Sequence, residues 1–157
     1  MEERIIQSLM HEYQLDELSA EERRIVEMAI EATDRSYAPY SNFHVGAALL
    51  LDNGETFIGC NQENAAFPVG LCAERTALFA AGAQYPDVGV KVLAIAARGT
   101  DGELVDEPVS PCGSCRQVMV ETEKRFGHEM IILLHGRKRI LRIEGIKPLM
   151  PLTFTEF

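Results

Sequence analysis

The chain has 157 residues, of which 46% are hydrophobic, so we expect a single domain over residues 1–157 with one sizeable core. Its 15 basic residues stand against 24 acidic ones, and the formal net charge of -9 argues against a nucleic-acid partner, because phosphates are bound mainly by Lys and Arg. No apolar run reaches the roughly eighteen residues of a membrane span and no secretory signal begins the chain, so we expect a cytoplasmic protein without a membrane partner.

The first twenty residues carry a helical pattern. Four apolar residues recur at helical spacing within residues 2–14: Ile5, Ile6, Leu9 and Tyr13. We therefore expect residues 1–20 to form an N-terminal helical extension of the domain. Ser19 and Glu22 then form a capping box that opens a second helix, which ends before Ala38-Pro39.

The rest of the chain alternates between strands and helices. Asn53-Gly54 is a strong hairpin signal, so strands near 44–51 and 55–60 are expected to be antiparallel neighbours. The later elements are expected in this order: a helix at 72–83, a buried strand at 90–97, a helix at 112–126, and strands at 130–135 and 139–143. This β-β-α-β-α-β-β order predicts an α/β fold with a mixed five-stranded sheet between helices, a three-layer α/β/α sandwich.

Two short cysteine motifs suit a metal site. Cys-Ala-Glu at 72–74 supplies one thiolate and one acid, and Pro-Cys-Gly-Ser-Cys at 111–115 supplies two more thiolates. A catalytic zinc has three protein ligands and an open fourth position, whereas a structural zinc is closed by four. Glu74 points to a different side of a helix from Cys72 but can reach a bound water. The sequence therefore predicts one Zn²⁺ per subunit, held by Cys72, Cys112 and Cys115 beside a catalytic Glu74.

The same cysteines leave two other interpretations open. A C-x-x-C pair can be a redox dithiol, although Glu74 would then have no task. It can also be half of a structural zinc site, which Cys60 could close as a fourth thiolate, making the chain a zinc module that binds a partner protein. With the open site, Cys60 is left over and is expected to be a small buried apolar residue.

Four segments together resemble those of the small, homotetrameric, three-cysteine cytidine deaminases. These segments are Tyr40–Ala48, Cys60–Ala65, Cys72–Ala77 and Pro111–Gln117, and the likeness runs from about residue 21 to the end. Zinc-dependent nucleobase deaminases share H-x-E followed by P-C-x-x-C, with Cys allowed for the His. The resemblance implies hydrolytic deamination of cytidine and 2'-deoxycytidine in pyrimidine salvage, in a homotetramer with shared active sites.

The resemblance also implies roles for individual residues. Glu74 would move protons, and Arg75 would hydrogen-bond the cysteine sulfurs. Apart from the resemblance, we expect Arg116 to be an exposed helix arginine. Asn61 and Glu63 would hold the ribose 3'-hydroxyl. The full set implied for substrate binding is Phe43, Asn61, Glu63, Ala73 and Phe154, the last reaching a neighbouring subunit's site.

The sequence departs from the family pattern at Phe67, and one alternative substrate class remains open. Phe67 stands where many relatives have tyrosine, so a hydroxyl near the sugar or the subunit boundary is missing. A related deaminase that acts on another amino-substituted ring, such as guanine, a tRNA base or a nucleoside antibiotic, would keep the metal ligands and change the ring and sugar contacts.

Overall fold

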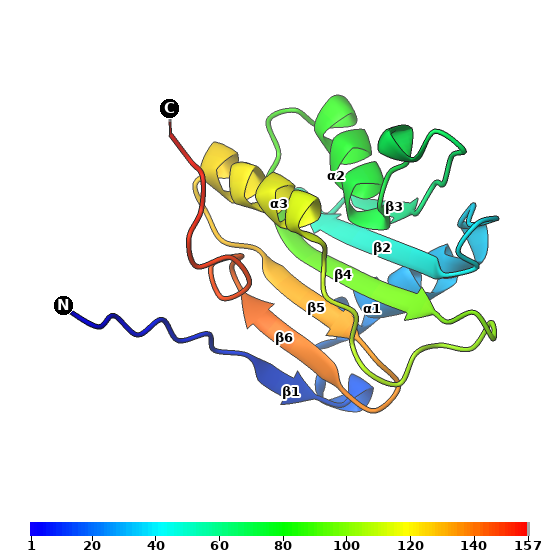
Figure 1. Cartoon of the computed structure of the whole chain (residues 1–157), viewed down its shortest axis with the longest axis horizontal. Helices are drawn as coiled ribbons and strands as arrows, with labels where there is room; N and C mark the ends of the chain where they lie inside the picture. The colour runs from blue at the N-terminus through cyan, green and yellow to red at the C-terminus, as the bar shows by residue number, and fades with distance from the viewer. Residues whose placement is uncertain (157) are drawn as a thin grey trace.

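A computed structural model describes residues 1–156 of the protein. Its central feature is one mixed sheet of six strands (Figure 1). The strands are β1 (His11–Tyr13), β2 (His44–Leu51), β3 (Thr56–Cys60), β4 (Val90–Arg98), β5 (Ile131–His135) and β6 (Ile140–Glu144). The α-helices are α1 (Ala20–Ala32), α2 (Ala73–Gln84) and α3 (Gly113–Phe126), and three short 3-10 turns lie at Leu15–Glu17, Thr33–Arg35 and Phe67–Val69.

The strands lie in the order β1-β6-β5-β4-β2-β3. β4 and β5 are parallel, and the other neighbouring pairs are antiparallel. The predicted hairpin of β2 and β3 is confirmed, and its turn contains Gly54 at a φ of 88°, a conformation that glycine adopts without a steric penalty. The crossover from β4 to β5 runs through α3, which lies on the same face of the sheet as α2 (Figure 1).

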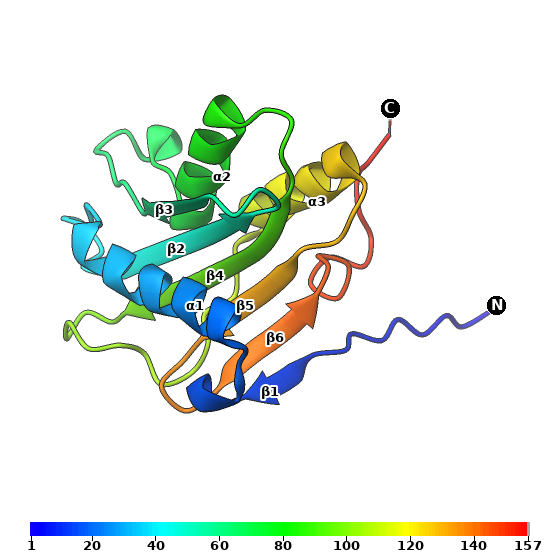
Figure 2. The ribbon, with the colours of Figure 1, turned by 180° about the vertical axis from the view of Figure 1, so that it is seen from behind.

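Helices cover both faces of the sheet, as the three-layer prediction requires. α1 crosses one face (Figure 2), and α2 and α3 cover the other. Alternate residues of β4 enter two separate hydrophobic clusters: Leu93 and Ile95 pack beneath α2 and α3, whereas Val92 and Ala94 pack beneath α1. Burial on both faces explains why residues 92–97 of β4 form an unbroken apolar run.

Two glycines set how closely the helices approach the sheet. A Cβ at Gly46 of β2 would lie 2.1 Å from the carbonyl oxygen of Ala29 in α1. A Cβ at Gly59 of β3 would lie 2.4 Å from the carbonyl oxygen of Ala73 and 2.5 Å from the amide nitrogen of Ala77, both in α2. These distances are far inside van der Waals contact, so Gly59 fixes where the first turn of α2 lies.

The predicted second helix is confirmed, together with its capping box. The amide of Glu22 donates to Ser19 Oγ at 3.2 Å, and the amide of Ser19 donates to Glu22 Oε2 at 3.3 Å. Glu22 also accepts a hydrogen bond from Arg142 of β6 at 2.9 Å, which joins the start of α1 to the sheet. Within residues 1–156, no helix has both the length and the apolar character needed to cross a bilayer.

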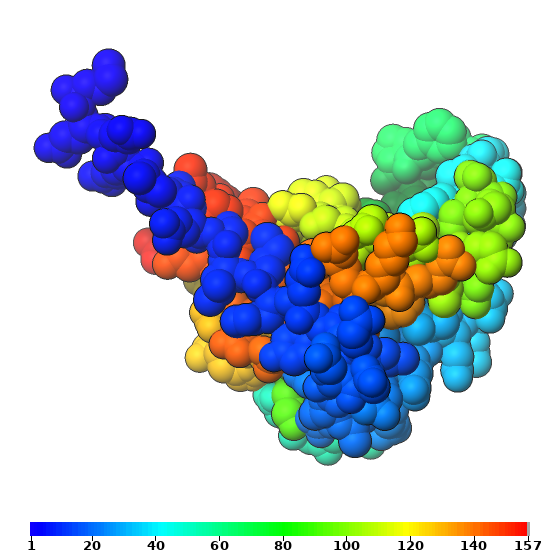
Figure 3. Space-filling view, turned by 90° about the horizontal axis from the view of Figure 1, so that it is seen from below, coloured from blue at the N-terminus to red at the C-terminus, as the bar shows by residue number. Residues whose placement is uncertain are grey.

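The N-terminal helical extension is wrong, and so is the strand count of five. Residues 1–10 form no helix or strand and project from the body as an arm (Figure 3), with Ile5 79% and Leu9 70% exposed. Tyr13 pairs instead with Ile140 of β6, which adds β1 as the sixth strand. A helix this short is marginal in water without a surface on which to bury its apolar face.

Candidate active site

The three predicted zinc ligands come together where α2 and α3 begin. Cys72 is the N-cap of α2, Cys112 is the N-cap of α3, and Cys115 lies in the first turn of α3. The sulfur of Cys112 lies 3.8 Å from that of Cys72 and 3.4 Å from that of Cys115, and all three sulfurs lie within 4.8 Å of one another. Two helices far apart in sequence therefore present three thiols to one point.

This donor set fits one zinc ion. Sulfurs bonded to a tetrahedral zinc at about 2.3 Å lie about 3.8 Å apart, close to the spacing of these three sulfurs. The N-termini of α2 and α3 also lie at this cluster, and the positive ends of their helix dipoles stabilise negative charge there. Binding a dication here requires little movement of the cysteines.

Cys60 does not belong to this cluster. Its Sγ lies 3.2 Å from the carbonyl oxygen of Arg35 and 3.2 Å from Gln62 Nε2. Within residues 1–156, the only group of cysteine, histidine and acidic side chains that could hold a metal is the three-cysteine cluster. The closed four-thiolate interpretation is therefore wrong, and Cys60 is a half-buried, hydrogen-bonded thiol rather than a buried apolar residue.

The thiols do not ionise independently. A hydrogen bond with Cys115, aided by Arg75 and opposed by burial, lowers the pKa of Cys72 to about 5. The same hydrogen bond, together with burial and the carboxylate of Glu74, raises the pKa of Cys115. Cys72 is therefore the first of these two sulfurs to carry a negative charge, and the positive charge of a metal would favour ionisation of Cys115 as well.

Glu74 is an acid held out of water beside the sulfurs. It lies in the first turn of α2 and is only 4% exposed. Burial raises the pKa of its carboxyl, and the negative charge of Cys72 acts in the same direction, whereas a hydrogen bond with Cys115 opposes them. A buried carboxyl with a raised pKa is the kind of group that accepts and returns protons in general acid-base catalysis.

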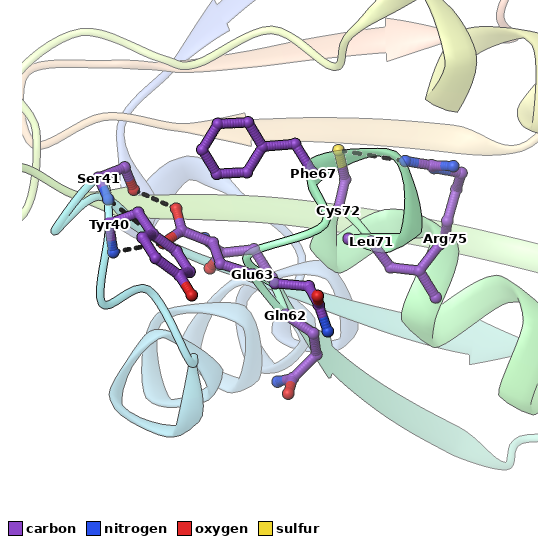
Figure 4. Close-up of a pocket in the computed structure, with 11 residues that line it drawn as sticks. Tyr40, Ser41, Gln62, Glu63, Phe67, Leu71, Cys72 and Arg75 are labelled. Carbon is purple, nitrogen blue, oxygen red and sulfur yellow. Dashed lines mark hydrogen bonds between the residues drawn. The ribbon is translucent and has the colours of Figure 1, made fainter.

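Arg75 faces the sulfurs from the next position of α2. Its Nη2 lies 3.8 Å from Cys72 Sγ, the contact drawn in Figure 4. Its Nε is buried and has no hydrogen-bond partner within residues 1–156. Three thiolates and one Zn²⁺ would leave a net charge of -1, which this guanidinium is placed to offset.

A cavity of about 570 Å³ opens beside Cys72, within the size range typical of small-molecule sites. Two loops, residues 37–43 and 61–71, supply most of its walls, and the rings of Tyr40 and Phe67 meet edge to face with centroids 5.8 Å apart. The lining residues are Tyr40, Ser41, Asn61, Gln62, Glu63, Asn64, Phe67, Gly70, Leu71, Cys72 and Arg75.

Only two of the five residues expected to bind substrate line this cavity. Asn61 and Glu63 line the cavity, whereas Phe43 is not part of its wall. Ala73 is fully buried at the start of α2. Phe154 lies away from this cavity, against α3, where its carbonyl oxygen accepts a hydrogen bond from Gln117 Nε2 at 2.8 Å.

Asn61 is tied to the start of β2. Its Oδ1 accepts from the amide of Val45 at 2.8 Å, and its Nδ2 donates to the carbonyl oxygen of Phe43 at 2.9 Å. Phe43 is thereby fixed through its backbone next to the cavity wall. Sequence reasoning missed Tyr40 and Ser41, which contact Glu63 and whose only sequence signal was their place within the first matching segment.

Arg116 is not the exposed helix arginine that we expected. It is half-buried, and it donates to the carbonyl oxygens of Pro111 at 2.8 Å and Leu149 at 2.6 Å. These bonds join the segment before α3 to the C-terminal segment. Arg116 thus supports the loop that carries Cys112.

Comparison with known proteins identifies the family. Residues 19–128 match the family model described as the cytidine and deoxycytidylate deaminase zinc-binding region. The chain belongs to this family. The matched span contains all three clustered cysteines, Glu74 and every residue that lines the cavity, so the family's zinc-binding region coincides with the site described above.

Individual relatives agree with this assignment. The chain is 46% identical over 97 residues to a cytidine deaminase of Halalkalibacterium halodurans, covering 62% of this chain and 68% of that protein. It is 38% identical over 104 residues to one from Mycobacterium tuberculosis, covering 66% and 71%. The crystal structure of a cytidine deaminase from Burkholderia pseudomallei superposes with a TM-score of 0.73 at 36% identity, covering 87% of this chain and all of that one.

Proposed function

We propose that this chain is a zinc-dependent hydrolase that deaminates cytidine and 2'-deoxycytidine to uridine and 2'-deoxyuridine with release of ammonia. The observation that carries this proposal is the cluster of three sulfurs at two helix N-termini beside the buried Glu74. The family match and the relatives named cytidine deaminase support the same reaction. We propose a single deaminase domain, with residues 1–10 as an arm rather than a helix.

The reaction replaces the amino group at C4 of the pyrimidine with oxygen from water. A zinc ion on Cys72, Cys112 and Cys115 would lower the pKa of a coordinated water toward about 7. Glu74 accepts a proton from the attacking water and delivers it to N3, which makes C4 more electrophilic. Glu74 then carries the second proton to the amino group, so that ammonia leaves as the C4 carbonyl forms.

Asn61 and Glu63 are proposed to hold the 3'-hydroxyl of the sugar. Both line the cavity, and an amide and a carboxylate together suit a group that donates and accepts hydrogen bonds. We propose that Phe43 packs against the pyrimidine ring and that Ala73, next to Cys72, also contacts the substrate. Phe154 is proposed to act in a neighbouring subunit, in keeping with its distance from the cavity of its own chain.

The charge of the cavity favours a free nucleoside over a nucleotide or a polynucleotide. Among the lining residues, Arg75 is the one cation, and its guanidinium is turned toward Cys72. Glu63 adds a carboxylate at the wall, which would repel a phosphate. The net charge of -9 acts in the same direction over the whole chain.

We also propose a cytoplasmic homotetramer that shares its active sites and serves pyrimidine salvage. Three phenylalanines that are exposed in the single chain suit contact with other subunits: Phe67 at 73%, Phe79 at 51% and Phe154 at 65%. Sedimentation equilibrium should give four times the chain mass of 17.5 kDa. A monomer that turns over cytidine would contradict the shared sites.

The direct test is an assay of purified protein with cytidine, following both the change in absorbance and the release of ammonia. We expect turnover that a zinc chelator abolishes and added zinc restores. Guanine and adenosine serve as competing amino-substituted rings. Turnover of one of these rings without turnover of cytidine would favour the related deaminase, and zinc binding without any turnover would defeat the enzyme assignment.

A further inference from the structure

Glu63 is an exposed side chain held by an unusual number of hydrogen bonds. It lies on the loop after β3, outside any helix or strand, where a glutamate ordinarily samples many rotamers. Both of its carboxylate oxygens are nevertheless bonded to residues 40–41, which belong to a different loop of the cavity wall. Its carboxylate is therefore fixed before any ligand arrives.

Ser41 supplies most of this restraint. The amides of Tyr40 and Ser41 donate to Glu63 Oε2 at 2.8 and 3.2 Å, and Ser41 Oγ donates to Glu63 Oε1 at 2.5 Å. Figure 4 shows the three side chains grouped at one end of the cavity. The hydroxyl of Ser41 is itself oriented, because it accepts a hydrogen bond from the amide of Phe43 at 3.0 Å.

The backbone around Ser41 is equally constrained. Asn42 has a φ of 52°, a left-handed conformation that asparagine tolerates better than most residues, and its amide donates to the carbonyl oxygen of Ala38 at 3.0 Å. The amide of Glu63 donates to the carbonyl oxygen of Tyr37 at 2.8 Å. The two loops are thus joined through both backbone and side chain.

These hydrogen bonds leave one acceptor site of the Glu63 carboxylate unoccupied. An ionised carboxylate has about four lone-pair sites, two on each oxygen. Two donors occupy Oε2 and one occupies Oε1, which leaves one acceptor site on Oε1. The donors also lower the pKa of Glu63, with the hydroxyl of Ser41 as the largest cause and the amide of Tyr40 next, so the carboxylate stays ionised and ready to accept.

We propose that Ser41 is a positioning residue for the deaminase reaction, which aims the remaining acceptor site of Glu63 Oε1 at the 3'-hydroxyl of the substrate sugar. This inference rests on the proposed function, because it assigns a supporting partner to the proposed sugar contact. Ser41 acts through Glu63 and contributes to the choice of sugar rather than to the chemistry at C4.

The test compares cytidine with 3'-deoxycytidine, which lacks the hydroxyl that Glu63 would hold. The measured quantity is the ratio of kcat/KM for cytidine to that for 3'-deoxycytidine. In Ser41→Ala this ratio should fall by about 5- to 10-fold, the size expected when one charge-assisted hydrogen bond is lost. Ser41→Thr keeps a hydroxyl and should restore most of the ratio. A general loss of stability would lower both rates and leave the ratio unchanged.

Ser19→Ala is the matched control, because it removes a serine hydroxyl that also bonds a glutamate, far from the cavity. In Ser19→Ala, the ratio of kcat/KM for cytidine to that for 3'-deoxycytidine should equal the ratio in the wild type. If Ser41→Ala does not fold, Ser41→Gly removes the same hydroxyl and tolerates the turn. A wild-type enzyme that deaminates cytidine, with an unchanged ratio in the serine variants, overturns the positioning role alone. A wild type that does not deaminate cytidine overturns the proposed function instead.

Discussion

At the scale of single residues, Glu74 combines burial, a raised carboxyl pKa and contact with the cysteine cluster. Glu74→Gln keeps the shape of the side chain but cannot accept a proton. We expect kcat for cytidine to fall by about 10²- to 10⁴-fold, the usual contribution of a general acid-base group, with zinc content unchanged. Rates and bound zinc should be measured on the same samples.

The control for this variant is Glu31→Gln, which changes an exposed glutamate of α1. It should match the wild type in both measurements. A Glu74→Gln enzyme with a near-normal rate would remove Glu74 from the mechanism, whereas one that has also lost zinc would show that the carboxylate supports the metal site.

Three of the four cysteines are expected to bind zinc, and Cys60 is not. Cys112→Ala removes one of three clustered sulfurs, so bound zinc and deamination should both be lost. Cys60→Ala changes a thiol outside the cluster, and this variant should keep about one zinc per chain. Elemental analysis after dialysis measures the zinc bound per chain in each variant. Loss of zinc from Cys60→Ala would support the four-thiolate site.

The sequence was informative about this site because its central residues form local motifs. Cys72 and Glu74 are two positions apart, and Cys112 and Cys115 are three apart, so their spacing and its match to the zinc-deaminase pattern predicted their chemistry. The restraint on Glu63 was not predictable in this way. Its partner Ser41 is 22 residues away, and only the folded loops bring the two together.

At the scale of elements, the contact of α2 with β3 determines where Cys72 lies. Gly59→Ala would place a Cβ 2.4 Å from the backbone of Ala73, the residue that follows the ligand. We expect a loss of about 1–3 kcal/mol in the free energy of unfolding, as for other overpacked sites, together with weaker zinc binding. Thermal melts and a competition assay with a chromogenic chelator measure the two effects.

Gly82→Ala provides the comparison within the same helix. Gly82 lies inside α2, and a Cβ there meets no atom within 4 Å. Replacing an unobstructed helical glycine should stabilise the protein by about 0.5–1 kcal/mol and leave zinc affinity unchanged. Equal effects of the two substitutions would show that Gly59 does not set the position of α2.

Most helices and strands were predictable, and the exception at the N-terminus is instructive. Buried elements are recognisable because packing selects their residues: β4 is a short apolar run, and α2 has apolar residues that face the sheet. Ile5, Ile6 and Leu9 also have helical spacing, but their side chains stay 55–79% exposed, so core packing does not select a helix there. The pairing of Tyr13 with Ile140 depends on a strand edge more than a hundred residues later, which local periodicity cannot reveal.

At the scale of the whole molecule, His135 links the free energy of unfolding to pH. It is 6% exposed, its Nδ1 has no hydrogen-bond partner within residues 1–156, and burial lowers its pKa. The unfolded chain, with an ordinary histidine pKa near 6.5, therefore binds this proton more readily than the folded chain does. The stabilising contribution is complete above that pH and is lost as the pH falls from about 6.5 toward the lower folded-state pKa.

Urea denaturation of the wild type and of His135→Gln at several pH values between about 7.5 and 5.5 tests this linkage. The wild type should lose more stability than the variant on acidification, and taking the difference cancels the titration of other groups. His11→Gln, at an exposed histidine, should follow the wild type. Parallel curves for the wild type and His135→Gln would mean that His135 titrates normally.

The cavity wall and the metal ligands belong to separable parts of the molecule. The sulfurs sit at the starts of two helices that pack on the sheet, and a close glycine contact fixes α2. Most of the wall consists instead of residues 37–43 and 61–71, which lie outside the helices and strands apart from one short turn. An engineer seeking new nucleoside analogues as substrates should randomise or graft these two stretches and leave the scaffold untouched. Because the stretches hydrogen-bond each other, a library that exchanges them as a pair should yield more active clones than one that varies either alone.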